Sequence, residues 1–243
     1  MTTVKNEYDD RKKDIDKFFK LYSDIAVREA QLVYPNEGDT RENISSDVVA
    51  ILKSGLFLAY YNCVESTVTN CLNRIVRAIQ EDNCKYNELN RKLKKTYMSS
   101  YFGRINSDSS SIKERVPIIM DMIDYIVFDT AVSVELKDLL NSSSEGNYSG
   151  SLDARLVRKT FEKFGVDLTG DECAEMQKIK DIRNQLAHGE KAFNECCRDF
   201  VPEYIEKAKT NLFSFLDQMI SKVEDYMDNK KYLVANFADF GEY

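Results

Sequence analysis

The sequence predicts an all-α fold, an up-and-down helical bundle built around long central helices. Its 243 residues include only three prolines and nine glycines, and 43% of them are hydrophobic. Long helices need few turn formers, whereas an all-β chain needs many. Apolar residues also recur at three- and four-residue steps, as on the buried side of an amphipathic helix. No strand pattern and no domain boundary stand out, so we expect a single domain over residues 1–243.

The N-terminal part is expected to hold two long helices. The first runs from about Glu7 to Gln31 and is broken by residues 35–39, which include a proline and a glycine. The second spans roughly Ser46 to Gln80. Because its first half is apolar on more than one face, we expect it to be a central, buried helix.

The middle of the chain is expected to hold shorter helices. A basic helix is predicted from Tyr86 to Phe102, residues 107–111 form a loop, and an apolar helix follows from about Val116 to Ile126. Residues 141–150 are rich in serine, asparagine and glycine, so they are expected to form a second loop.

Three more helices are predicted in the C-terminal part. Ser151 is expected to cap a helix from Leu152 to Phe164, which Gly165 ends. Another helix runs from about Asp171 to Gly189, since glycine commonly ends a helix in the left-handed conformation. The last begins near Pro202, because proline suits the first helical turn.

The chain is acidic, with a formal net charge of −7 and a pI of about 5.0. Binding that coats nucleic acid depends on basic surface and counterion release, so the acidic chain is poorly suited to it. A small, local phosphate site is not excluded. Residues 91–95 (Arg-Lys-Leu-Lys-Lys) and the group Arg155, Arg158 and Lys159 supply local positive potential. Taken alone, each cluster is more typical of a solvated helix face.

The cysteines and histidines give no sign of a metal site or a cofactor. Six cysteines show no C-x2-C pair, and one histidine cannot complete the usual zinc-ligand spacing. Free thiols, no signal peptide and no apolar stretch near 20 residues predict a soluble cytoplasmic protein without a membrane partner.

His188 is the only histidine, and Arg183 lies five residues before it. Imidazole takes and gives protons near neutral pH, and the guanidinium fork fits phosphate oxygens. Five helical residues correspond to roughly 140° of rotation and about 7.5 Å of rise. The two side chains can therefore converge only where the helix ends, or where a symmetric dimer presents two copies across a cleft.

This pair suits metal-independent RNA cleavage, in which the ribose 2′-hydroxyl attacks the neighbouring phosphate. His188 would assist proton transfer, and Arg183 would stabilise the charge on the phosphorane. The reaction needs both a base and an acid, which a homodimer would supply from two histidines. The competing interpretation is a solvated helix-end histidine that interacts favourably with the helix dipole.

The string Arg183-Asn-Gln-Leu-Ala-His-Gly189 resembles the Arg-x4–6-His motif of the HEPN superfamily of helical nucleotide-binding domains. Further segments resemble a bacterial HEPN-like nuclease group: residues 58–67 (LAYYNCVEST), 150–155 (GSLDAR), 161–165 (FEKFG) and 226–233 (YMDNKKYL). The resemblance covers roughly Arg11 to Leu233.

The resemblance implies a HEPN-like bundle that pairs through its motif-bearing helices. It also implies a metal-independent endoribonuclease, commonly a bacterial toxin or an anti-phage defence effector. Arg183 and His188 carry over as catalytic residues, and Asn184 matches the polar residue that usually follows the arginine. Some HEPN toxins have a tyrosine two residues after the histidine, which a partner nucleotidyltransferase modifies; Glu190 stands there in this chain, so that control is not expected.

Glu65 is a polar residue on the otherwise apolar second helix. It is expected either to support the site, by bonding Arg183 or orienting His188, or to lie at the helix surface.

The implied partners are an RNA substrate, with tRNA as one candidate, a second copy of the chain, and an antitoxin or sensor protein. The alternative function is a non-catalytic helical dimer that binds a nucleotide or a partner protein, as an adaptor or scaffold in a defence or toxin–antitoxin system. The acidic surface fits protein partners better than long RNA. RNA cleavage that a His188 variant loses would discriminate between the two.

Overall fold

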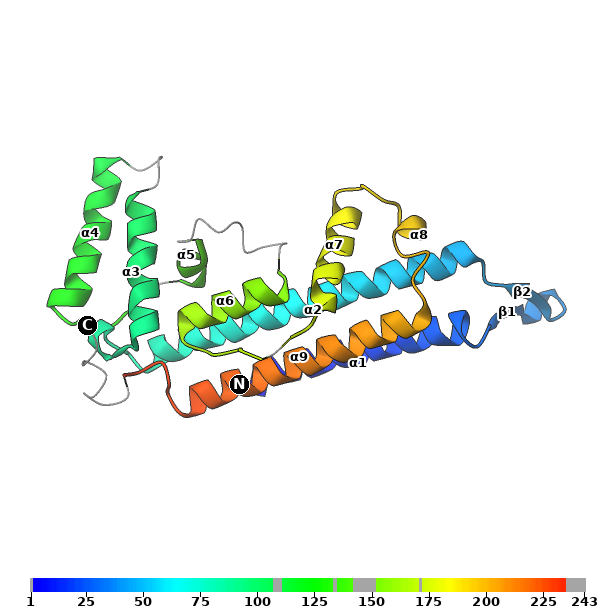
Figure 1. Cartoon of the computed structure of the whole chain (residues 1–243), viewed down its shortest axis with the longest axis horizontal. Helices are drawn as coiled ribbons and strands as arrows, with labels where there is room; N and C mark the ends of the chain where they lie inside the picture. Colours follow the sequence, from blue (N-terminus) through cyan, green and yellow to red (C-terminus); the bar gives the residue numbers. More distant parts are fainter. Residues whose placement is uncertain (1, 107–110, 133–134, 142–151, 171, 235–243) are drawn as a thin grey trace.

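The structure is a computed structural model, and it describes residues 2–106, 111–132, 135–141, 152–170 and 172–234. Helices form most of this part, which confirms the all-α prediction. Figure 1 shows three long helices side by side along an elongated molecule: α1 (Thr2–Ala26), α2 (Ser46–Glu81) and α9 (Pro202–Asp228). Nearly all the buried apolar residues of these three helices belong to one connected core.

The central helix is α2, as predicted, and its end differs from the expected one by a single residue. Ser45 caps its start, because the Ser45 hydroxyl accepts a hydrogen bond from the Val48 N–H. Apolar residues on several of its faces are buried against α1, α7, α8 and α9. Among the described residues, α2 is the one helix long and apolar enough to cross a membrane, contrary to the expectation that no such stretch would be found.

The expectation that the chain holds no strands was wrong. β1 (Gln31–Tyr34) and β2 (Thr40–Asn43) pair antiparallel on either side of a short 3₁₀ turn. This hairpin lies at one end of the molecule (Figure 1). All eight strand residues are exposed, so no buried face produces the alternation that reveals a strand.

A second pair of helices stands at the opposite end (Figure 1): α3 (Arg91–Ile105) and α4 (Ile112–Val127). A 3₁₀ turn, η2 (Tyr86–Glu88), precedes α3, where the sequence predicted one continuous helix. α4 begins earlier than predicted, and the short helix α5 (Leu136–Asn141) was not predicted. Nearly all of the two predicted loops, residues 107–110 and 142–150, lies outside the described residues.

α6 (Ala154–Phe164) ends at Gly165, as predicted. The predicted cap, Ser151, lies outside the described residues; Asp153 caps the helix by accepting a hydrogen bond from the Leu156 N–H at 2.8 Å. Gly165 has φ +91°, and a Cβ there would lie 2.8 Å from the Asn90 Nδ2. Glycine is therefore required both for its conformation and for the close approach of α3.

α7 (Glu175–Ala187) carries the candidate motif and starts later than the predicted Asp171. The short helix α8 (Phe193–Cys196) follows and was not predicted. All six cysteines are free thiols, which agrees with the sequence.

Candidate functional site

His188 lies at the exposed C-terminal end of α7. Gly189 follows with φ +68°. The Glu190 N–H donates to the Gln185 carbonyl at 2.9 Å, and the Gly189 N–H donates to the Leu186 carbonyl at 3.3 Å. This pair of bonds is a Schellman motif, which ends the helix immediately after His188. The predicted end of this helix at Gly189 is confirmed.

Arg183 lies one turn before this end and is turned toward α2. Its guanidinium carbon is 5.1 Å from the centroid of the Tyr61 ring, within the range of a cation–π contact. Its Nη1 donates to the Asn184 Oδ1 at 3.1 Å. The carbonyl of Asn184 in turn accepts the His188 N–H at 3.0 Å, so Asn184 bonds to both candidate catalytic residues.

Tyr61 is the residue that the sequence reasoning missed. Its side chain is 1% exposed, and its hydroxyl accepts a hydrogen bond from the Leu152 N–H at 3.3 Å. Burial raises the pKa of Tyr61, and the charge of Glu65 adds to this, whereas the Leu152 N–H and the Arg183 charge oppose it. The phenol is therefore neutral at cellular pH and forms a fixed platform beneath Arg183.

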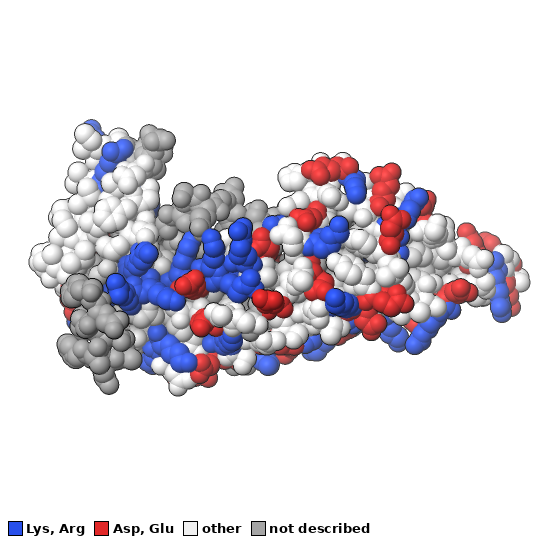
Figure 2. Space-filling model, in the orientation of Figure 1, with Lys and Arg blue, Asp and Glu red and all other residues white. Residues whose placement is uncertain are grey.

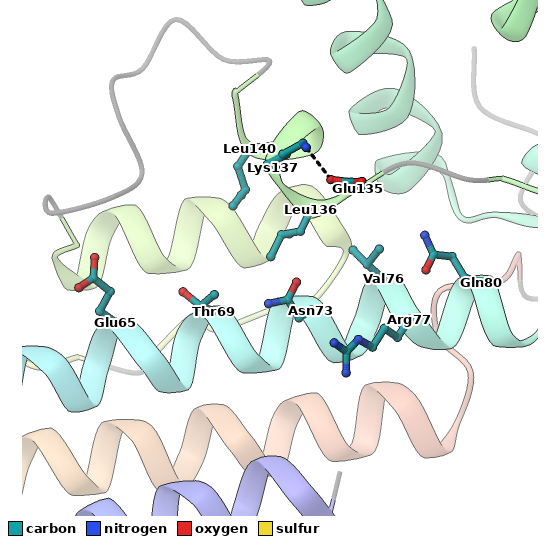
Figure 3. A pocket seen from close by; sticks show the side chains of 10 residues that line it. All are labelled: Glu65, Thr69, Asn73, Val76, Arg77, Gln80, Glu135, Leu136, Lys137 and Leu140. Carbon is teal, nitrogen blue, oxygen red and sulfur yellow. Dashed lines mark ion pairs between the residues drawn. The ribbon is translucent and has the colours of Figure 1, made fainter.

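Glu65 lies one helical turn after Tyr61 and is half-buried. It stands at one end of an elongated cavity of about 590 Å³ between α2 and α5 (Figure 3). Thr69 and Asn73 continue this wall of the cavity along α2. Glu65 and Arg183 thus shift the pKa of the Tyr61 hydroxyl in opposite directions, because their charges are opposite. A direct bond from Glu65 to Arg183, or an orienting role toward His188, stays a prediction.

The segment that follows His188 is held firmly against α2. The buried Lys53 ammonium donates to the carbonyls of Arg198 and Phe200, at 3.1 and 2.6 Å. The Ser54 hydroxyl donates to the Phe193 carbonyl at 2.7 Å. Burial lowers the pKa of Lys53, and its bonds to two carbonyls compensate the buried charge. The chain that follows His188 is therefore anchored to α2 from Phe193 onward.

An ion pair joins α7 to the start of α6. Lys180 and Asp153 lie 2.9 Å apart, and both side chains are largely buried. Burial alone would raise the pKa of Asp153, but the Lys180 ammonium and the Leu156 N–H lower it overall. α6 therefore begins next to the part of α7 that carries Arg183.

The crossing of α2 and α7 brings together Arg183, Asn184, Tyr61 and Glu65, whereas His188 lies at the free end of α7. Among the described residues, no hydrogen bond or ion pair joins Arg183 to His188. One copy of the chain thus holds an oriented guanidinium and an exposed imidazole on the same helix, but not in contact with each other. The described residues also contain no group of three or more His, Cys, Asp or Glu side chains that could hold a metal ion.

Comparison with known families agrees with this architecture. The model of the HEPN_MAE_28990-like HEPN family, a helical family, matches residues 1–232. Neither the curated proteins nor the solved structures gave a match. Because the family match extends over nearly the whole chain, this protein belongs to the HEPN_MAE_28990-like HEPN family.

Proposed function

We propose that this protein is a metal-independent endoribonuclease that cleaves RNA by attack of the 2′-hydroxyl. Membership of a HEPN family supports a nuclease-type or related function. The observation that carries the finer proposal is the end of α7, where Tyr61 and Asn184 orient Arg183 and the Schellman motif leaves His188 open to solvent.

The proposed reaction needs one group that removes a proton, one group that supplies a proton and one cation that stabilises the phosphorane. His188 removes the proton of the 2′-hydroxyl as its oxygen bonds to phosphorus, and His188 of the partner subunit protonates the leaving 5′-oxygen as the P–O5′ bond breaks. Arg183 donates to the non-bridging oxygens of the phosphorane. The products end in a 2′,3′-cyclic phosphate and a 5′-hydroxyl. A positioned proton-transfer group accelerates such a reaction roughly 10²- to 10⁴-fold, and a preorganised cation or hydrogen-bond donor accelerates it about 10²- to 10³-fold.

The proposal requires a homodimer, because one chain supplies one imidazole. Two copies would meet through the outer ends of their α7 helices, in an isologous contact that repeats each residue across a two-fold axis. RNA, including tRNA, is the proposed substrate in the cytoplasm. A role as a bacterial toxin or anti-phage effector, under an antitoxin or sensor, follows the family resemblance.

Purified wild type, His188→Ala and Arg183→Ala should be incubated with total RNA and with a tRNA pool, at neutral pH in the presence of EDTA. Wild type is expected to cut and to leave cyclic phosphate ends, while both variants lose cleavage. Lys191→Ala is a matched control, since Lys191 is an exposed cation beyond the end of the same helix. Full cleavage by either motif variant, or a strict Mg²⁺ requirement, would contradict the proposal.

The cavity between α2 and α5 favours one second candidate, a non-catalytic nucleotide-binding dimer. Its volume of about 590 Å³ lies within the range of small-ligand sites. Its lining carries the cations Arg77 and Lys137 together with the carboxylates of Glu65 and Glu135, and Glu135 pairs with Lys137 at 2.8 Å. Saturable nucleotide binding that His188→Ala retains, without cut RNA, would support this candidate over the nuclease.

A further inference from the structure

Basic side chains are concentrated on one part of the molecule. Figure 2 shows Lys and Arg gathered over α6 and the lower part of α3. α6 contributes four cations spread along its length, two of them adjacent, and α3 contributes three from its first two turns. We call this set the α3–α6 basic surface: Arg91, Lys92, Lys95, Arg155, Arg158, Lys159 and Lys163.

The fold, rather than the sequence, joins the two clusters into one surface. The Asn90 side chain caps α3 by accepting the Leu93 N–H at 2.9 Å, and it donates to the Tyr226 hydroxyl at 3.2 Å. That hydroxyl donates to the carbonyl of Phe164, the last residue of α6. The Thr96 hydroxyl also donates to the Lys163 carbonyl at 2.7 Å. The start of α3 is therefore fixed beside the end of α6.

The charge of these two helices contrasts with that of the whole chain. Together α3 and α6 carry nine Lys and Arg residues and one carboxylate, Glu162, whereas the chain has a net charge of −7. Glu162 pairs with Lys92 at 3.5 Å. Lys94 is not part of the surface, because its ammonium donates to the Asn87 carbonyl and lies over the Tyr86 ring. A concentrated positive potential of this kind attracts a polyanion.

The α3–α6 basic surface leads to the candidate site. At the start of α6, the Leu152 N–H bonds to the Tyr61 hydroxyl, and Asp153 pairs with Lys180 of α7. Arg155 follows in the first turn of α6, and Arg183 lies over the same Tyr61 ring. Acidic side chains gather near the outer end of α7 (Figure 2), so a polyanion would approach Arg183 from the α6 side.

We infer that the α3–α6 basic surface binds the sugar-phosphate backbone of the RNA strand and directs it to Arg183. This inference rests on the proposed function. α6 is roughly 16 Å long at 1.5 Å per residue, which is enough to contact successive phosphates of a single strand. Contacts to phosphates position a strand without reading its sequence, so the surface would set affinity and path rather than the base at the cut.

Binding should be measured with His188→Ala as the parent, so that RNA is bound without being cut. The test variant adds Arg155→Gln, Arg158→Gln and Lys159→Gln, and the matched control adds Lys5→Gln, Lys13→Gln and Lys20→Gln, three exposed lysines of α1. Fluorescence anisotropy with a labelled single-stranded RNA gives the affinity from 50 to 200 mM salt. Single Arg155→Gln serves if the triple variant does not fold.

The test variant is expected to bind about 10- to 100-fold more weakly, with a salt slope smaller by roughly 0.7 for each lost phosphate contact. The control should bind like the parent. Equal binding by the test variant, or an equal loss in the control, would overturn the inference even if wild type cleaves RNA. Tighter, variant-sensitive binding to vesicles of anionic lipid than to RNA would overturn the assignment to RNA. RNA binding through this surface without any cutting would leave the inference intact and contradict the nuclease proposal.

Discussion

The Arg183 guanidinium carbon lies 5.1 Å from the centroid of the Tyr61 ring, and this contact joins α7 to α2 at the candidate site. The ring is buried and its hydroxyl is held by the Leu152 N–H, so the guanidinium rests on a rigid surface. A charge donor that is oriented before the reaction need not reorganise as charge develops on the phosphate. Under the proposed function, Tyr61 is therefore a positioning residue for Arg183.

Replacing the Tyr61 ring should impair the chemical step. Tyr61→Leu removes the cation–π contact, worth about 1–2 kcal/mol when partly desolvated, so kcat is expected to fall about tenfold. Tyr61→Phe keeps the ring and should retain most of the activity, with little change in KM. Single-turnover cleavage rates check this, together with thermal melts that establish folding. A Phe variant as defective as the Leu variant would show that the ring is not what matters.

Mixed dimers should reveal whether two histidines act in one site. Wild type and His188→Ala are co-refolded at varied ratios, and cleavage is measured at constant total protein. If each cut needs both imidazoles, activity follows the square of the wild-type fraction, so an equal mixture retains about one quarter. Cleavage activity that falls in direct proportion to the wild-type fraction would mean that one histidine per site suffices. Mixing the proteins without refolding is the control for subunit exchange.

Two glycines at helix ends should respond differently to alanine. Both have positive φ, which costs a residue with a Cβ roughly 1–2 kcal/mol. At Gly189 no atom lies within 4 Å of the added Cβ, whereas at Gly165 that atom meets the Asn90 Nδ2 at 2.8 Å. Urea unfolding should therefore show a loss of about 1–2 kcal/mol for Gly189→Ala and a larger one for Gly165→Ala, because overpacking adds to the strain. Equal losses would mean that Asn90 moves aside freely.

The long helices and several of their ends were predictable because local signals specify them, although α1 begins and ends five residues earlier than the predicted Glu7–Gln31. The apolar pattern of α2 gave its bounds to within one residue, and Gly165, Gly189 and Pro202 marked helix ends correctly. The hairpin was missed because its strands bury neither face, and α5 and α8, with six and four residues, are too short to show a period. The cap of α6 was assigned to Ser151 because both serine and aspartate can cap, and only geometry selects Asp153.

The candidate site was predictable where it is local and not where it depends on tertiary contacts. Arg183, Asn184 and His188 follow one another on a single helix, so the sequence places them together. Tyr61 lies on a helix far away in sequence, and nothing in its neighbourhood says that Arg183 rests on it. Spacing also could not show that Arg183 turns inward while His188 lies exposed, since this depends on how α7 crosses α2.

The Asp153–Lys180 pair should make the stability of the α6–α7 junction depend on acid pH. Because the folded-state pKa of Asp153 lies below its ordinary value of 3.8, its contribution is fully present above the unfolded pKa. The contribution is lost as pH falls through the folded-state pKa. Asp153→Asn keeps an oxygen for the Leu156 N–H but removes the charge, so it should cost about 1 kcal/mol at neutral pH, and this cost should shrink as pH falls through the folded-state pKa of Asp153. Asp153→Ala also removes the cap and should cost about 1 kcal/mol more. Urea unfolding of both variants and wild type from pH 2 to 7 tests this, with exposed Glu162→Gln as the control. If wild type is still more stable than Asp153→Asn by the same amount at pH 2, the ion pair is not the source of the difference in unfolding free energy.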